Sequence, residues 1–430
     1  MTHPGMSAEL CLKCNICTAA CPVAAATDLF PGPKAVGPQA ERFRHPHLPS
    51  PDASVTWCSG CGTCTRVCPH GVNVAEINIV AKAQLVEEHG APLRDQAISR
   101  PHWLGALAGP LAAIANPVLQ QRWARLALGA VLRIHPDAPM PAFQRRTLRG
   151  QTRRHRVRSP QDILTSSDKA VAFFHGCSAE YYEPGLGLLT LRLLEHLGLQ
   201  PVIPPQTCCG LPLQSNGLFG AARAQARRNA RSLAPFARAG IPIVGTSTSC
   251  TLALKHDYRA ILALEGQDFD DMAAGTYDIF EFLLYARPDL LRERALDPLP
   301  LRVLYHPPCQ LRSHFIGTPA LQILRRIPRL EIVLSEAECC GVAGTYGLKS
   351  EKFPVARRVG DVLLAQIQDV RPDLVLTDSE TCRWWLAGLS GNRLVHPIEV
   401  LAASLGLAPL PGRPARAEGE RTTGLSQAPG

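Results

Sequence analysis

Short apolar runs alternate with longer amphipathic stretches over residues 166–408, and this alternation predicts strands separated by helices. The run AVAFFHGC precedes the helical pattern LGLLTLRLLEHLG, and LRVLYHPPC occupies the corresponding place later in the chain. Further strand candidates are PVIPP, IPIVG, LEIVLSE and DLVLTD, and the longest helical stretches cover residues 219–239 and 350–369. Strands separated by helices are typical of parallel sheets joined by right-handed crossovers. We therefore expect an α/β fold for this region.

The same region is an internal repeat marked by cysteines. Its two halves contain Cys177, Cys208, Cys209 and Cys250, and Cys309, Cys339, Cys340 and Cys382. The first cysteine, the first of the pair and the last cysteine recur after 132, 131 and 132 positions, and a glycine follows each pair. Ordinary core cysteines would be scattered, so the matched spacing favours a shared chemical role.

Each cysteine of the repeat follows a predicted strand. Because the loops after parallel strands gather at one edge of a sheet, where ligands bind, each half is expected to bring four thiolates to one rim. The glycine behind each pair permits a turn that a side chain forbids and lets the backbone approach a cofactor. A metal centre at each rim is therefore the expectation.

The N-terminal part has a different cysteine pattern. Two runs of the form C-x2-C-x2-C-x3-C-P lie 47 positions apart. This spacing is typical of two [4Fe-4S] clusters in a helical ferredoxin-type domain, where the fourth cysteine of each run binds the other cluster. We therefore assign one cluster to Cys11, Cys14, Cys17 and Cys68, and the other to Cys58, Cys61, Cys64 and Cys21. Two zinc sites, the alternative, would use pairs of cysteines instead of runs of four.

Composition and motifs limit the kind of protein and the cofactors that we expect. The 430 residues allow two or three domains, and a content of 46% apolar and 19% charged residues is that of a globular protein. The first ten residues lack the features of a secretory signal, so thiolates that bind metal are expected instead of disulfides. The chain has no G-x-G-x-x-G, no phosphate-binding loop and no C-x-x-C-H, so we expect no flavin, nicotinamide or attached haem on it.

We expect five segments in the chain. They are a two-cluster domain at 1–97, an amphipathic, arginine-rich connecting region at 98–165, repeat halves at 166–298 and 299–408, and a disordered tail at 409–430.

The connecting region has an unusual charge distribution. Residues 101–121 contain no Lys, Arg, Asp or Glu, although two prolines and an asparagine interrupt them, and residues 145–158 contain seven arginines. Between these stretches one helical face carries Trp123, Leu126, Ala130, Val131 and Ile134. Such a helix beside a basic stretch can lie on an anionic membrane surface. The alternative is a hairpin packed on the protein with solvated arginines. No recognition motif indicates nucleic-acid binding.

The duplicated Cys, Cys-Cys-Gly, Cys pattern resembles the cysteine-rich (CCG) domain of heterodisulfide reductase-type proteins. The iron-sulfur subunits of glycolate oxidase and of anaerobic glycerol-3-phosphate dehydrogenase share this domain. That family usually has a fifth cysteine in each half, at the positions where this chain has Ser247 and Ser379. The resemblance therefore implies one or two further four-thiolate clusters. A half that is empty or holds another metal is the alternative.

Two stretches are similar to the iron-sulfur C subunits of anaerobic glycerol-3-phosphate dehydrogenases. They are residues 11–44, with the sequence FPGPK after the first cysteine run, and residues 100–118. The resemblance implies an electron-transfer subunit that lies peripherally on the cytoplasmic side of the inner membrane. A flavoprotein partner would oxidise the substrate, and menaquinone would accept the electrons. The alternative is the iron-sulfur subunit of a glycolate or lactate oxidation complex, or of a heterodisulfide reductase-type enzyme.

In each half one histidine stands shortly before the first cysteine. His175 and His306 are placed to hydrogen-bond a cluster sulfur or to relay a proton. The alternative is a loop histidine held by the backbone, and Tyr181 and Tyr182 are expected to pack.

Overall fold

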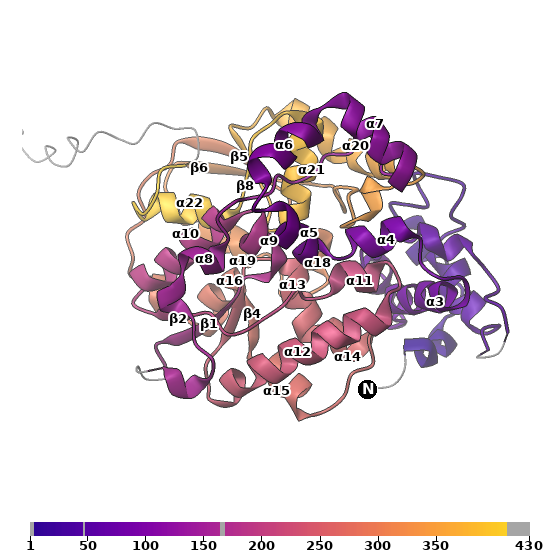
Figure 1. The fold of residues 1–430 in the computed structure, drawn as a ribbon, viewed down its shortest axis with the longest axis horizontal. Helices are drawn as coiled ribbons and strands as arrows, with labels where there is room; N and C mark the ends of the chain where they lie inside the picture. Colours follow the sequence, from indigo (N-terminus) through magenta and orange to yellow (C-terminus); the bar gives the residue numbers. More distant parts are fainter. Residues whose placement is uncertain (1–3, 46–47, 164–167, 411–430) are drawn as a thin grey trace, which may run out of the picture.

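A helical N-terminal part and two α/β halves make up the chain in the computed structural model, which describes residues 4–45, 48–163 and 168–410 (Figure 1). Most of the tail expected at 409–430 lies outside the described residues.

The N-terminal part is built around α3, Val74–His89. Two short helices, α1 (Ile16–Ala19) and α2 (Thr63–Arg66), contact each other, and α2 also packs on α3. Short helical segments at Pro4–Leu10, Ala35–Gln39 and Ser54–Trp57 complete this part, and α4 (Leu93–Ile98) leads out of it. The helical character expected for this part is confirmed.

The connecting region forms short helices that lie over the rest of the chain. They are α5 (Pro101–Ala108), α6 (Ala112–Gln120), α7 (Arg122–Leu132) and α8 (Leu148–Gln151). Gly105 of α5 lies so close to Tyr181 that an added Cβ would stand 2.5 Å from the tyrosine Cβ. Asn116 of α6 donates to the carbonyl of Phe143 and accepts from its N–H, both at 2.9 Å. In the described part of the chain no helix combines the length and apolarity that a membrane crossing requires.

The first half contains a parallel sheet in the order β2-β1-β3-β4. Its strands are β1 (Ala170–Phe174), β2 (Gln200–Val202), β3 (Ile243–Gly245) and β4 (Thr276–Asp278). Its helices are α9 (Gly176–Tyr181), α10 (Pro184–His196), α11 (Leu211–Ser215), α12 (Phe219–Arg238), α13 (Thr248–Leu252), α14 (Tyr258–Ala260), α15 (Gln267–Gly275), α16 (Ile279–Glu281) and α17 (Asp289–Arg292).

The second half repeats this topology in the order β6-β5-β7-β8. Its strands are β5 (Leu301–Tyr305), β6 (Leu330–Leu334), β7 (Leu374–Leu376) and β8 (Leu394–Val395). Its helices are α18 (Cys309–Arg312), α19 (Pro319–Leu324), α20 (Phe353–Val370), α21 (Glu380–Ser390) and α22 (Pro397–Ser404). The predicted parallel sheets, separated by helices, are confirmed in both halves, whereas β4 and β8 were not predicted from the sequence.

One layer of helices joins the two sheets. Helix α10 contacts α22, and α19 contacts both α16 and α22. The apolar side chains of these helices and the facing residues of both sheets form a single buried cluster, which includes Val171, Val244, Val303 and Leu376. Each half therefore covers apolar surface of the other.

The glycine behind the second cysteine pair provides a test of how closely that pair packs on α20. Gly341 has φ +93°, and an added Cβ would lie 2.0 Å from the backbone oxygen of Ala356 in α20. We expect Gly341→Ala to lower the free energy of unfolding by about 3 kcal/mol or more. Gly344 also has a positive φ, +63°, but has open space around it, so Gly344→Ala should cost only about 1–2 kcal/mol. Urea unfolding of the anaerobically purified proteins measures both losses, and equal losses would contradict the close approach.

Candidate functional site

The fourth cysteine of the first run lies with three cysteines of the second. A single cavity is lined by Cys21, Cys58, Cys61 and Cys64, together with Pro22 and Phe30. Burial, with a contribution from the thiols of Cys61 and Cys58, raises the pKa of Cys21 to about 12. Such thiols ionise only where a metal cation replaces the proton, so the cavity fits a centre that supplies positive charge.

The other set gathers around Cys17. Burial raises the pKa of Cys17, and the nearby thiols of Cys11 and Cys68 add to the effect. Cys14, the remaining member of the set, is exposed. The structure thus places Cys68 beside the first run and Cys21 beside the second, as the crossed assignment requires.

The backbone turns in the same way in both runs. Lys13 and Asn15 have φ values of 60° and 72°, and Gly60 and Gly62 at the corresponding positions have 70° and 79°. Backbone in this left-handed region turns successive N–H groups to one side and forms a concave surface that attracts anions. The negatively charged sulfurs of a cluster are suitable ligands for such a surface.

In the first half the rim cysteines follow β1, β2 and β3. The Sγ atoms of Cys177 and Cys208 are 3.8 Å apart. Tyr258 donates its hydroxyl hydrogen to the Cys209 carbonyl at 2.7 Å, and the Asn229 side chain donates to the Cys208 carbonyl at 3.2 Å. The buried tyrosine and asparagine therefore hold the backbone of the cysteine pair in place.

The second half has an equivalent rim with a different support. The Sγ atoms of Cys340 and Cys382 are 3.0 Å apart, and Gly341 donates its N–H to Cys339 Sγ at 3.3 Å. Here the indole N–H of Trp385 binds the Cys340 carbonyl at 3.0 Å. Sequence reasoning missed the supports of both pairs, because each lies 21 or more positions from the cysteine that it holds.

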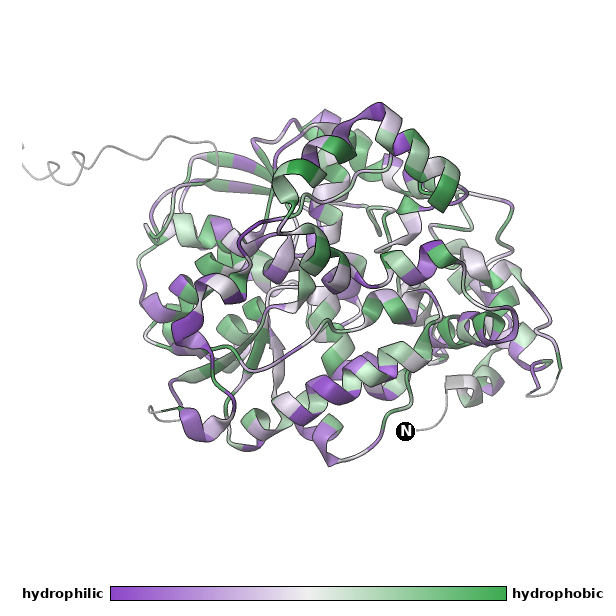
Figure 2. Ribbon diagram, viewed as in Figure 1, coloured by the Kyte–Doolittle hydropathy of each residue, from purple (hydrophilic) through white to green (hydrophobic). Residues whose placement is uncertain are grey.

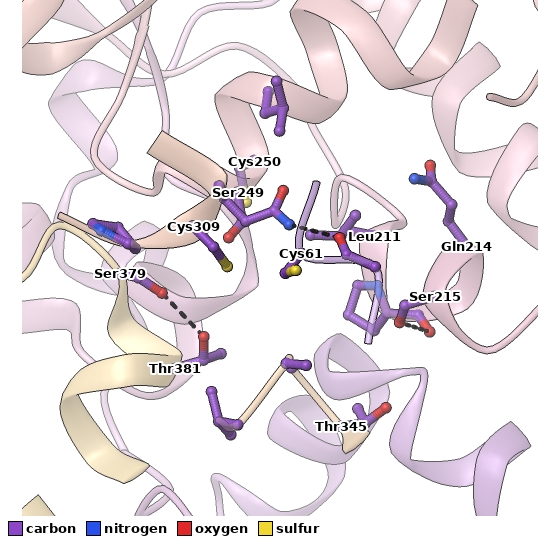
Figure 3. Close-up of a pocket in the computed structure, with 18 of the residues that line it drawn as sticks. Cys61, Leu211, Gln214, Ser215, Ser249, Cys250, Cys309, Thr345, Ser379 and Thr381 are labelled. Carbon is purple, nitrogen blue, oxygen red and sulfur yellow. Dashed lines mark hydrogen bonds between the residues drawn. The ribbon is translucent and has the colours of Figure 1, made fainter. Parts of the chain in front are cut away.

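A central cavity of about 780 Å³ connects the two rims with the N-terminal part (Figure 3). Its lining includes eight cysteines, namely Cys61, Cys177, Cys209, Cys250, Cys309, Cys339, Cys340 and Cys382. Ser313 donates to the carbonyl of Cys61 at 3.4 Å, and Gln310 donates to that of Gly60 at 3.3 Å. Through these contacts the second cysteine run lies directly against the second half. In the described ranges no three His, Cys, Asp or Glu side chains are arranged to ligate a single metal ion.

Ser247 and Ser379 have roles that a thiol would not fill equally well. Ser379 precedes α21, and its hydroxyl accepts from the N–H of Cys382 at 3.5 Å as a helix cap. Ser247 donates to a carboxylate oxygen of Glu380 at 3.0 Å, which links the two halves beside the cavity. Each rim is left with four thiols.

Both histidines beside the rims are buried. Nδ1 of His175 lies 2.7 Å from the Gly176 carbonyl, and Nδ1 of His306 lies 2.9 Å from the Ser335 hydroxyl. Burial lowers the pKa of each imidazole to about 4, so both rings are neutral at pH 7. The contact of His175 matches the alternative of a loop histidine held by the backbone, whereas His306 is held by a side chain 29 positions away. Tyr182 packs and donates its hydroxyl to the Pro101 carbonyl at 2.7 Å.

The amphipathic face of α7 does not pack on the protein. Trp123, Leu126 and Val131 are 65%, 51% and 79% exposed, and Ile134, just beyond the helix, is buried. Helices α5 and α6 and the turn between them also carry exposed large apolar side chains, namely Trp103, Leu107, Leu111 and Ile114. Figure 2 shows apolar residues on the connecting helices. Of the seven arginines at 145–158, all except Arg149 are exposed.

Comparison with known protein families agrees with both cysteine patterns. Residues 7–72 match the 4Fe-4S dicluster domain, and residues 171–255 and 303–387 each match the Cysteine-rich domain (CCG).

The chain is also similar to curated proteins over most of its length. It is 34% identical to the C subunit of the anaerobic glycerol-3-phosphate dehydrogenase of Escherichia coli, over 93% of this chain and 99% of the relative. The glycolate oxidase iron-sulfur subunit of the same species is 25% identical over 92% and 93%. The D subunit of the dihydromethanophenazine:CoB--CoM heterodisulfide reductase of Methanosarcina acetivorans is 23% identical over 88% of each chain.

Substitution of the fourth cysteine of each run by alanine tests the crossed arrangement. We expect Cys68→Ala to damage the cluster of Cys11, Cys14 and Cys17, because the structure places Cys68 with that set. The matched variant Cys21→Ala should damage the cluster of Cys58, Cys61 and Cys64. Electron paramagnetic resonance of the reduced proteins distinguishes the two centres. If Cys68→Ala lost only the signal of the cluster of Cys58, Cys61 and Cys64, the crossed assignment would be contradicted.

Proposed function

The chain belongs to the family of iron-sulfur C subunits of anaerobic glycerol-3-phosphate dehydrogenase, and on this premise we propose that it conducts electrons from a flavoprotein partner to menaquinone at the membrane. Substrate oxidation belongs to the partner in this proposal. The observation that carries it is the meeting of three groups of thiols at the central cavity, where Cys61 joins the cysteines of both rims.

The exposure of the thiols indicates where electrons enter the proposed relay and where they go. Cys14 is exposed, so the set of Cys11, Cys14, Cys17 and Cys68 is the one that a partner protein can approach most closely. The set around Cys58 is buried and lies against the second half. When bound, [4Fe-4S] clusters accept and release single electrons. The cysteines thus provide stepping positions from the surface to the central cavity.

The rims of the two halves are proposed to hold one or two further clusters. Four thiols suffice for a [4Fe-4S] centre, and the serines at 379 and 247 are committed to a helix cap and an inter-half hydrogen bond. The proposed ligands are Cys177, Cys208, Cys209 and Cys250 in the first half, and Cys309, Cys339, Cys340 and Cys382 in the second.

The connecting helices are proposed as the membrane-facing surface. An apolar helix face that remains exposed in a folded chain, followed in the sequence by a run of exposed arginines, suits the interface of an anionic bilayer. This supports a peripheral position at a membrane, which in this proposal is the cytoplasmic side of the inner membrane. The glycolate-type and heterodisulfide-type alternatives are less well supported, because those relatives are only 25% and 23% identical.

Iron analysis and reduction of the clusters by the substrate together test the relay. Anaerobically purified protein should contain about eight iron atoms from the N-terminal clusters alone, and more when the rims are loaded. In the complex with its flavoprotein, glycerol 3-phosphate should reduce the clusters, as followed by electron paramagnetic resonance. Reduction by glycolate or lactate in its place would overturn the proposed substrate class, and a protein without iron would overturn the relay.

Substitution of the exposed apolar side chains tests the membrane surface. We expect Trp103→Gln, Ile114→Gln and Trp123→Gln in combination to weaken sedimentation with anionic vesicles by about tenfold or more, because each loses apolar area that would enter the interface. Leu48 is 58% exposed on the N-terminal part, so Leu48→Gln serves as the matched control. Undiminished sedimentation of the triple variant would reject this surface.

A further inference from the structure

A second cavity of about 490 Å³ contains too few cysteines to be a cluster site. Cys58 is the single cysteine in its described lining. The walls come from the end of α3, the turn before α4, the loop at Trp57 and the segment from 343 to 352. The cavity therefore lies beside one proposed cluster but is available to another molecule.

Three hydrogen-bond donors that line this space have no charged acceptor among the described residues. Tyr346 is 7% exposed, and its hydroxyl has no hydrogen-bond partner among the described residues. Lys352 is 6% exposed, and its ammonium group lies over the Trp57 ring, 3.2 Å from the ring centre. Lys82 donates to the carbonyls of Cys58 at 2.7 Å and Ser215 at 3.4 Å, neither of which carries a charge.

The acidic residues of the cavity are already paired. Asp95 accepts from Lys349 at 2.8 Å and from Arg94 at 2.9 Å, and Glu351 accepts two hydrogen bonds from Arg94. Neither Lys82 nor Lys352 forms an ion pair with a carboxylate among the residues that the structure describes. Burial lowers the pKa of Lys352 to about 7, and repulsion by the nearby ammonium group of Lys82 contributes to the lowering. A ligand that presents acceptor oxygens would relieve this repulsion.

Part of the remaining lining is apolar, and one wall continues toward the connecting helices. Leu85, Val86 and Pro92 form part of the wall. Arg94, also in the wall, donates to the carbonyl of Arg133 at 3.1 Å, and Arg133 directly follows α7. The exposed apolar face of α7 thus ends beside the cavity. The volume lies in the usual range for ring-sized ligands and is larger than a small inorganic anion requires.

We propose that this lysine-lined cavity binds the head group of a quinone, with Tyr346, Lys352 and Lys82 as donors to its two carbonyl oxygens. The inference rests on the proposed function and names its acceptor site. The quinone takes up two electrons, one at a time, from the centre beside Cys58 and two protons from solvent, and leaves as quinol. The positive charge of Lys82, and that of Lys352 when it is protonated, stabilise the negative charge that arrives with the first electron.

Kinetics with a short-chain naphthoquinone tests the donors in the full complex. Tyr346→Phe removes only the hydroxyl and should raise KM several-fold, and Lys352→Met should raise it about tenfold or more. Lys352→Arg keeps the charge and should restore most of the affinity. Tyr285 is 53% exposed and outside the cavity, so Tyr285→Phe is the matched control with unchanged KM. Wild-type KM in both Tyr346→Phe and Lys352→Met would overturn the proposal.

Photolabelling locates the site independently of turnover. A photoreactive azido-naphthoquinone should label peptides that contain Trp57 or residues 85–94, and Lys352→Met should reduce the label while the iron content stays unchanged. Labelling at Pro141–Phe143 or Pro308–Phe315, which line the central cavity, would overturn this site but not the proposed function. A loaded complex that reduces a dye but no quinone would overturn both.

Discussion

The burial of reactive thiols against one another is the constraint on which this structure depends. Eleven of the sixteen cysteines are buried, and burial raises the pKa of members such as Cys21 and Cys64. A protein gains little from neighbouring thiols in an apolar setting unless a cation binds them, because a lone buried thiolate is costly. The residues that position them, Tyr258, Asn229 and Trp385, contact the backbone of the cysteine pairs and leave the sulfurs free.

Much of this arrangement could be predicted from the sequence, because the cysteines that share a site follow short, regular spacings. The two four-cysteine runs and the recurring Cys-Cys-Gly indicate which thiols share a site, and the apolar runs before them indicate sheet edges. The structure places Cys21 and Cys68 with the opposite runs and confirms the two parallel sheets.

What could not be predicted depends on contacts between distant segments. The strand β8 is only two residues long and has no pattern of its own. The hydrogen bond from Ser247 to Glu380 joins residues 133 positions apart. The apolar face of α7 has the same spacing whether it packs or is exposed, so its exposure is visible only when the rest of the chain is in place. The lysine-lined cavity likewise draws its walls from four separate segments.

The helical layer between the sheets has a consequence for how the repeat unfolds. The first half contributes α10 and α16 to this layer, and the second half contributes α19 and α22. The apolar side chains of these helices are buried only while both halves are present. Loss of one half would expose this surface, and the free energy of that exposure couples the two melting transitions. We therefore expect the repeat, although duplicated in sequence, to unfold as one cooperative unit.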